Sequence, residues 1–136
     1  MKALMFTAGL GTRLRPLTEK TAKPTLPILN IPMLCYPLFA LEQMGVNEIT
    51  FNLHYLPETV REAVDKLKLV HKVNFSNELD LILESAGGMK AAEKYLSDDK
   101  PFITINGDAV FLIDETKNDL NILIHHGGNH FNEVTN

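Results

Sequence analysis

The residues best suited to chemistry lie in one short stretch, residues 7–18, which contains two glycines and two arginines. An apolar run at residues 3–6 precedes it, and a buried strand that ends in a glycine-containing loop brings backbone N–H groups close to phosphate in α/β proteins. Glycine tolerates positive φ and close approach of a ligand, and arginine adds a permanent charge with a fork of donors. The stretch therefore predicts a triphosphate-binding loop.

Two better-known loops are excluded by spacing. The chain has no Gly-x-x-x-x-Gly-Lys-Ser/Thr pattern, and the dinucleotide fingerprint fails because Leu14 stands where the third glycine belongs and Pro16 follows. A bare Gly-x-Gly by itself favours a plain structural turn. Arg13, Arg15 and the downstream pair Lys23-Pro24 change this balance toward a phosphate site.

A carboxylate is expected opposite this loop. The apolar run 102–106 predicts a strand that leads directly into Gly107-Asp108. Ligands gather beyond the carboxyl ends of parallel strands, so Asp108 and the glycine loop should lie at the same edge. Mg²⁺ takes one or two carboxylates together with substrate phosphates, which suggests a magnesium-bound nucleotide. Taken alone, however, an aspartate that follows glycine is more often a turn residue.

Longer ordered runs resemble a known family. Gly-Leu-Gly-Thr-Arg-Leu at residues 9–14, Pro-Leu-Thr at 16–18 and Ala-Lys-Pro-x-Leu-Pro-Ile at 22–28 resemble the signature of the sugar-1-phosphate nucleotidyltransferases. The resemblance continues at residues 83–88 and 106–108. It covers residues 1–113, interpreted as the nucleotide-binding part of such a domain, and leaves a C-terminal tail at 114–136 without a match.

The resemblance implies specific roles. Arg13 would contact the leaving pyrophosphate and Lys23 the reacting phosphates, as the catalytic residues, while Asp108 would bind Mg²⁺ as the metal ligand. The residues expected to bind the nucleotide are Ala8, Gly9, Gly11, Thr12, Glu84, Gly87 and Gly88. In the family the glycine pair lets the nucleobase lie against the backbone. From the residues alone, Gly87-Gly88 is a tight connection before a helix, which Ser85 could cap.

Strand and helix patterns alternate along the chain. Strands are expected at residues 2–8, 48–54, 72–75 and 102–106, and helices at 30–44, from Pro57 onward and at 88–96. Pro37 is awkward inside the first helix, which must begin later or be kinked. The alternation predicts an α/β fold with a mostly parallel, Rossmann-like sheet flanked by helices.

Composition limits the classes of function. The chain of 136 residues is 45% apolar and 22% charged, typical of one globular domain, and its net charge of −4 argues against nucleic-acid or membrane-surface partners. Cys35, the single cysteine, is expected to be a buried, unreactive thiol. The sequence has no apolar stretch of about 18 residues and no signal peptide, so a cytoplasmic location is expected. The histidines of the tail match no zinc pattern.

The predicted reaction transfers a nucleoside monophosphate from a nucleoside triphosphate to a sugar-1-phosphate, with Mg²⁺ as cofactor. Catalytic domains of the family are longer, so the chain is interpreted as truncated, with self-association to cover an exposed sheet edge. The alternative is a nucleotide-binding or regulatory module, or an inactive remnant, without turnover. A Rossmann redox domain is excluded, because the third glycine of the dinucleotide fingerprint is absent.

Overall fold

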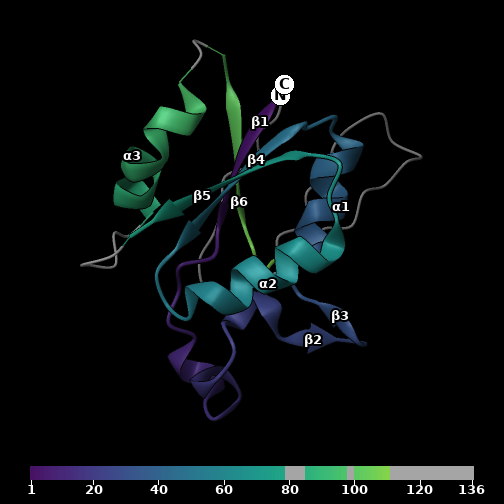
Figure 1. The fold of residues 1–136 in the computed structure, drawn as a ribbon, viewed down its shortest axis with the longest axis vertical. Helices are drawn as coiled ribbons and strands as arrows, with labels where there is room; N and C mark the ends of the chain where they lie inside the picture. The colour runs from purple at the N-terminus through teal and green to yellow at the C-terminus, as the bar shows by residue number, and fades with distance from the viewer. Residues whose placement is uncertain (79–84, 98–99, 111–136) are drawn as a thin grey trace.

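The computed structural model describes residues 1–78, 85–97 and 100–110, and these form a parallel sheet with helices on both faces (Figure 1). The four strands lie in the order β5-β4-β1-β6, and every pairing among them is parallel. Their bounds are β1 Lys2–Phe6, β4 Glu48–Leu53, β5 Lys72–Asn77 and β6 Phe102–Asn106. The predicted α/β fold with a mostly parallel sheet is confirmed.

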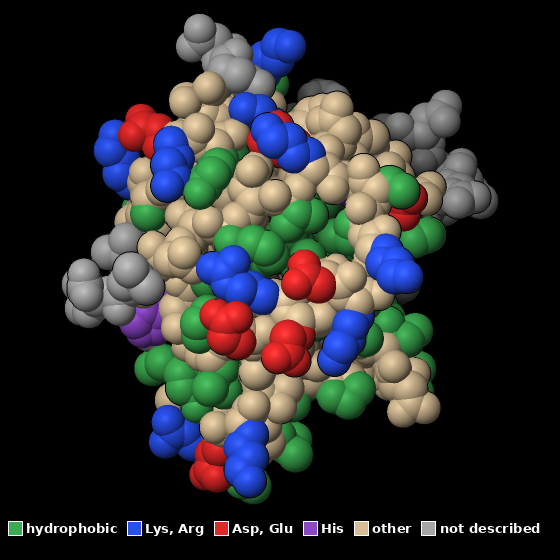
Figure 2. Space-filling model, viewed as in Figure 1, with side chains coloured by type: hydrophobic (Ala, Val, Ile, Leu, Met, Phe, Trp, Pro, Cys, Tyr) green, Lys and Arg blue, Asp and Glu red, His purple; other side chains and the backbone are tan. Residues whose placement is uncertain are grey.

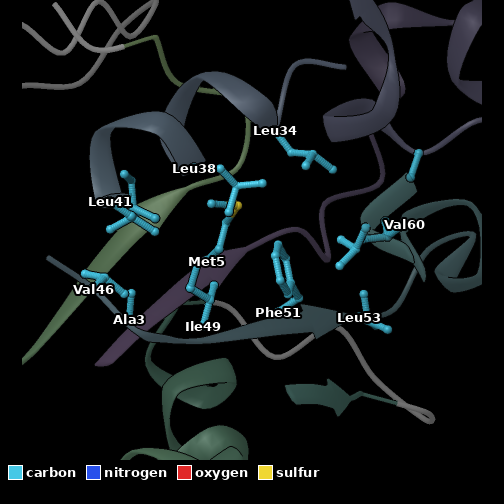
Figure 3. Close-up of a cluster of buried hydrophobic side chains, with 13 residues drawn as sticks. Ala3, Met5, Leu34, Leu38, Leu41, Val46, Ile49, Phe51, Leu53 and Val60 are labelled. Carbon is cyan, nitrogen blue, oxygen red and sulfur yellow. The ribbon is translucent and has the colours of Figure 1, made fainter. Parts of the chain in front are cut away.

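Side-chain alternation along β1 divides the core between the two faces of the sheet. Ala3 and Met5 point to one face and pack with Phe51 of β4 against α1 (Cys35–Gln43) and α2 (Pro57–Leu67) (Figure 3). Leu4 points to the other face and packs against α3 (Ser85–Leu96). Because helices cover both faces, β1 is an apolar run rather than an alternating pattern.

The first predicted helix begins later than expected. Residues 30–44 were expected to be helical, but α1 spans Cys35–Gln43, and the preceding residues form a hairpin of β2 (Pro27–Ile28) and β3 (Ile31–Pro32). Leu29 and Asn30, between these strands, have φ of 51° and 65°, as two-residue hairpin turns of the I′ kind require. Pro37 consequently lies in the first turn of α1, where its missing N–H removes no helical hydrogen bond.

The remaining elements match their predicted positions with shifted ends. The helix from Pro57 and the strand at 102–106 are confirmed, while β1 ends at Phe6 instead of residue 8 and β5 continues to Asn77. The prediction for α3 was wrong at its start, because the helix begins at Ser85 and not at Gly88. Gly87 and Gly88 therefore belong to its first turn, where neighbouring packing overrides the low helix propensity of glycine.

Parallel strands bring their following loops to one edge of the sheet. The segment after β1 lies below the strands in Figure 1, next to the end of β6. The backbone N–H of Gly107 donates to the carbonyl of Phe6 at 2.9 Å, which joins the loop after β6 to the end of β1. This carboxyl edge holds the residues that were predicted to bind nucleotide phosphate and metal. Among the described residues, no helix is long and apolar enough to span a membrane.

Candidate functional site

The loop after β1 has one position that only glycine fits well. Gly11 has a φ of 62°, and a Cβ atom there would lie 2.9 Å from Cγ2 of Thr18 and 3.2 Å from Cβ of Lys23. Leu14 then donates its N–H to the Gly11 carbonyl at 2.9 Å and starts a 3₁₀ turn over Thr12–Leu14. Gly11 thus lets the loop turn back against the segment that carries Lys23. Gly9 lies in open space, because a Cβ atom on this residue would meet nothing within 4 Å.

The segment that follows the loop is held by hydrogen bonds from the connection between β4 and α2 and from α2 itself. The hydroxyl of Thr18 donates to the Gly11 carbonyl at 2.8 Å, and the hydroxyl of Tyr55 donates to the Thr18 carbonyl at 2.9 Å. The N–H of Ala22 donates to the hydroxyl of Thr59, the third residue of α2, at 3.1 Å. These bonds fix the backbone just before Lys23, so they limit where its side chain can reach.

Lys23 and Asp108 meet at the carboxyl edge although 85 positions separate them in the sequence. The ammonium of Lys23 forms an ion pair with Oδ2 of Asp108, and the side chains are 33% and 17% exposed. Gly107 makes this approach possible, because a Cβ atom there would lie 2.8 Å from Cγ2 of Thr7 and 3.0 Å from the Phe6 carbonyl. The structure therefore brings together three predicted site residues, Gly11, Lys23 and Asp108.

Three polar side chains between positions 12 and 15 are open to solvent. Thr12, Arg13 and Arg15 are exposed, and neither arginine forms an ion pair with any other described residue. Ala8, two residues after the end of β1, is buried. Charges of both signs are interspersed over the face that Figure 2 shows, so a single cationic field does not dominate that face. Attraction for an anion at the carboxyl edge must therefore come from the nearby cations Arg13, Arg15 and Lys23.

Two further predicted residues lie at the start of α3. Gly87 is half-buried and Gly88 is buried within the first turn of this helix, which packs on β1, β4 and β5. The first N–H groups of a helix have no partner within it. Glu84 lies outside the described residues, as does the tail at 114–136.

Within the described part of the chain, few carboxylates lie at this edge. No cluster of three or more His, Cys, Asp or Glu side chains that could hold a metal ion occurs within residues 1–78, 85–97 and 100–110. Asp108 is the predicted ligand, and one carboxylate fits the Mg²⁺ sites that substrate phosphates and waters complete. A preassembled cage of protein ligands, such as Ca²⁺ or structural Zn²⁺ uses, does not fit the donors found among the residues that the structure describes.

Burial changes the chemistry of the single thiol. Cys35, the first residue of α1, is half-buried, and desolvation raises the pKa of its thiol. A raised pKa lowers the thiolate fraction at neutral pH, so the group is a poor nucleophile. The prediction of a buried thiol was therefore wrong in part, since Cys35 is only half-buried, while the raised pKa favours the unreactive thiol that was expected.

Sequence reasoning missed polar residues beneath the loops, among them Asn52 of β4 and Glu78 directly after β5. Both are buried, and the amide nitrogen of Asn52 donates to Oε1 of Glu78 at 2.8 Å. A usable signal was present for Asn52, because asparagine is depleted in strands and here lies inside the predicted strand, between Phe51 and Leu53.

Comparison with known proteins identifies the family. A family model described as "Nucleotidyl transferase" matches residues 2–129 of this chain. The chain belongs to the nucleotidyl transferase family. Mannose-1-phosphate guanyltransferase 2 of Candida glabrata is 39% identical over 113 residues, which cover 81% of this chain and 31% of that protein. Mannose-1-phosphate guanylyltransferase catalytic subunit beta of Dictyostelium discoideum is 36% identical, with the same two coverages of 81% and 31%.

Solved nucleotidyl transferase structures share the fold. HddC from Yersinia pseudotuberculosis, solved with GMP-PN, is 35% identical with a TM-score of 0.68 and covers 81% of this chain and 48% of that one. A UDP-glucose pyrophosphorylase solved with UDP-glucose has a TM-score of 0.72 at 18% identity, covering 84% and 48%. This chain spans about a third of the length of the curated relatives, 31% in both cases.

Proposed function

We propose that this chain is the nucleotide-binding part of a sugar-1-phosphate nucleotidyltransferase. The observation that carries the proposal is the meeting of Lys23 and Asp108 beside Gly11, at the edge where the loops after β1 and β6 converge. A cation, a carboxylate and a glycine turn at one sheet edge are suited to a nucleoside triphosphate with its metal ion. Membership of the family supports the same assignment.

The proposed reaction is an in-line displacement at the α-phosphorus. A phosphate oxygen of the sugar-1-phosphate forms a bond to the α-phosphorus, the bond from that phosphorus to the bridging oxygen breaks, and pyrophosphate leaves. Such a reaction needs positioning and neutralisation of charge more than covalent chemistry by the protein. Arg13, exposed on the first loop, is suited to the leaving pyrophosphate, and Lys23 is suited to the phosphates that react.

Asp108 would hold Mg²⁺ in this proposal, and the bound ion would neutralise charge on the phosphates. The Lys23–Asp108 ion pair occupies the same carboxylate, so binding of a metal–nucleotide complex would move the ammonium from Asp108 to phosphate oxygens. Ala8, Gly9, Gly11 and Thr12 would contribute the loop that faces the phosphates. Gly87 and Gly88, with Glu84, would lie against the nucleobase.

The names of the relatives suggest which substrates to assay first. They are mannose-1-phosphate guanyltransferases, and the HddC structure contains a guanine nucleotide analogue, so GTP and mannose-1-phosphate form the first pair. A cytoplasmic location and self-association belong to the same proposal. A nucleotide-binding or regulatory module without turnover is the second candidate function.

The test is calorimetric titration of the chain with each nucleoside triphosphate, with and without Mg²⁺. Lys23→Met and Asp108→Asn should each weaken binding of one triphosphate by roughly tenfold to a hundredfold, because each removes a charge-assisted contact. Lys66→Met removes the same charge from an exposed position at the end of α2 and should leave the affinity unchanged. Binding that is insensitive to Lys23→Met and to Mg²⁺ would contradict the assignment.

Turnover separates the two candidate functions. Release of pyrophosphate on addition of a sugar-1-phosphate to the triphosphate complex would identify the enzyme. Mg²⁺-dependent binding without pyrophosphate release for any sugar-1-phosphate would favour the binding module. No binding of any triphosphate would refute both candidates.

A further inference from the structure

Asn52 joins the ends of three neighbouring segments through one buried side chain. It lies in β4, only 4% exposed, with Phe6 of β1 as its register partner on one side and Ser76 of β5 on the other. Its Oδ1 accepts the backbone N–H of Thr7 at 2.6 Å, and its Nδ2 donates to Oε1 of Glu78 at 2.8 Å. We call these three residues, Thr7, Asn52 and Glu78, the Asn52 bridge.

The chemistry of the partners determines which end of the amide faces which residue. The N–H of Thr7 can only donate, so the amide oxygen must lie on the β1 side. The amide nitrogen then faces Glu78 and donates to its carboxyl oxygen Oε1. An asparagine satisfies both partners at once, whereas an aspartate or a leucine of similar size would leave at least one of them unsatisfied.

The bridge also contacts the loop that carries Asp108. The hydroxyl of Thr7 donates to the backbone carbonyl of Asn52, and this orients the Thr7 methyl group toward Gly107. Only glycine fits there, since a Cβ atom on residue 107 would lie 2.8 Å from that methyl carbon. Thr7, the first residue of the loop after β1, therefore contacts Gly107, the residue before Asp108.

Residues at the end of β4 also form hydrogen bonds with the backbone of Glu78. Glu78 donates its N–H to the carbonyl of Leu53 at 2.7 Å, and Nδ1 of His54 lies 2.6 Å from the carbonyl of Glu78. Because a carbonyl oxygen only accepts, this ring nitrogen of His54 is the donor. Glu78 is thus fixed in position and orientation by three consecutive residues, Asn52, Leu53 and His54.

Stability alone does not account for this arrangement. Burying a carboxylate and an amide is costly unless both are fully hydrogen-bonded, and apolar residues of similar size would stabilise the sheet at least as well. The side chains of the bridge are three of the six buried polar or charged residues in the part of the chain that is described, and all three lie at the carboxyl edge. A polar network that is costly to bury, at the edge assigned to the ligand, indicates that these side chains position the loops of the site.

We propose that Asn52 is a positioning residue of the nucleotide site, which acts by fixing the start of the glycine loop relative to Glu78 and Asp108. The proposal rests on the proposed function, because the loop it positions is the one assigned to the triphosphate. Asn52 itself is buried beneath the loops and contacts no ligand in this role.

The experiment exchanges donor and acceptor across the bridge. In Asn52→Asp, the Thr7 N–H keeps its acceptor, but two carboxylates meet where one hydrogen bond stood. The double variant Asn52→Asp/Glu78→Gln restores a donor and an acceptor with reversed polarity. Thr50→Val is the matched control, since Thr50 is buried on the same face of β4, two residues toward its amino end.

Two measurements are made on each variant, well below its Tm. Titration with the triphosphate that the wild-type chain binds gives Kd, and NMR hydrogen exchange of the amides of residues 7–14 reports the order of the loop without ligand. We expect Asn52→Asp to raise Kd by about tenfold and to speed exchange of the loop amides, with the double variant within about threefold of wild type. Thr50→Val should change neither quantity, even if it lowers Tm.

The outcomes separate this proposal from the proposed function. An unchanged Kd and unchanged loop exchange in Asn52→Asp would overturn the positioning role, and so would equal losses in Thr50→Val or a double variant that recovers neither quantity. If the wild-type chain binds no triphosphate, the proposed function fails. The hydrogen-exchange arm alone then decides whether Asn52 orders the loop.

Discussion

At the scale of single residues, the site depends on two glycines that let other groups come together. Gly11 turns the first loop back against Lys23, and Gly107 lets the end of β6 pass close to Thr7 and the Phe6 carbonyl. Neither glycine supplies a charge or a side-chain donor. Their contribution is the absence of a Cβ atom at two crowded points, which allows the Lys23–Asp108 ion pair to form.

We predict that Gly11→Ala destabilises the protein by about 1–2 kcal/mol, because alanine is strained at a φ of 62° and its methyl group would press on Thr18 and Lys23. Chemical denaturation measures the loss. Gly9→Ala is the matched control in the same loop, since its methyl group meets nothing within 4 Å and the free energy of unfolding should stay within about 0.5 kcal/mol of wild type. Equal effects of the two variants would contradict the strain argument.

At the scale of secondary-structure elements, neighbouring strands exchange polar contacts at both ends of the sheet. The amino end of β4 carries Glu48, which accepts from Nδ2 of Asn74 at 2.8 Å and pairs with Lys72 of β5 at 3.0 Å. The hydrogen bond from Asn74, assisted by the charge of Lys72, lowers the pKa of Glu48 against an opposing effect of burial. This contact lies away from the carboxyl edge and serves stability.

We predict a pH-dependent cost for Glu48→Gln. Since the folded-state pKa is lowered, ionised Glu48 stabilises the fold above the ordinary glutamate pKa, and this contribution is lost as pH falls through the folded-state value. The variant should lose about 1 kcal/mol at pH 7, and the difference from wild type should vanish at the acid end of the titration. Denaturation curves across this range measure it. The exposed Glu42→Gln should show no such trend, and a constant difference at every pH would contradict the prediction.

At the scale of the whole molecule, the strand order β5-β4-β1-β6 decides which loops can cooperate. β1 lies between β4 and β6, so the glycine loop has Asp108 on one side and the Asn52 bridge on the other. The apolar core on both faces keeps these strands in register. Ligand binding at this edge should therefore stabilise the entire domain and not only its loops.

We predict that a triphosphate with Mg²⁺ at about one hundred times its Kd stabilises the folded chain by about 2.7 kcal/mol, with a rise in Tm on the order of 10 °C. Differential scanning fluorimetry measures the shift. Addition of a chelator, or the Asp108→Asn variant, should remove most of it, while sulfate at the same ionic strength controls for salt. The absence of a shift with every triphosphate would argue against the site.

Most of the fold and the outline of the site could be predicted from the sequence, because both are recorded in local patterns. A strand covered on both faces is an uninterrupted apolar run, as at β1, and α2 shows the spacing of three and four that one buried helix face requires. The loop motif is also contiguous, so its resemblance to the nucleotidyl transferases was visible in the order of residues alone. Local patterns were weaker at boundaries, where the hairpin at residues 27–32 was partly predicted as helix.

The pairings among distant side chains depend on the tertiary structure. Lys23 reaches Asp108 across 85 positions, and Asn52 contacts both Thr7 and Glu78, 45 and 26 positions away. Periodicity reports whether a residue is buried, but not which strand will lie beside its own. The order of residues along the chain sets which residue types stand at the end of each strand. The order of the strands, set by packing of the whole core, decides which of those residues meet.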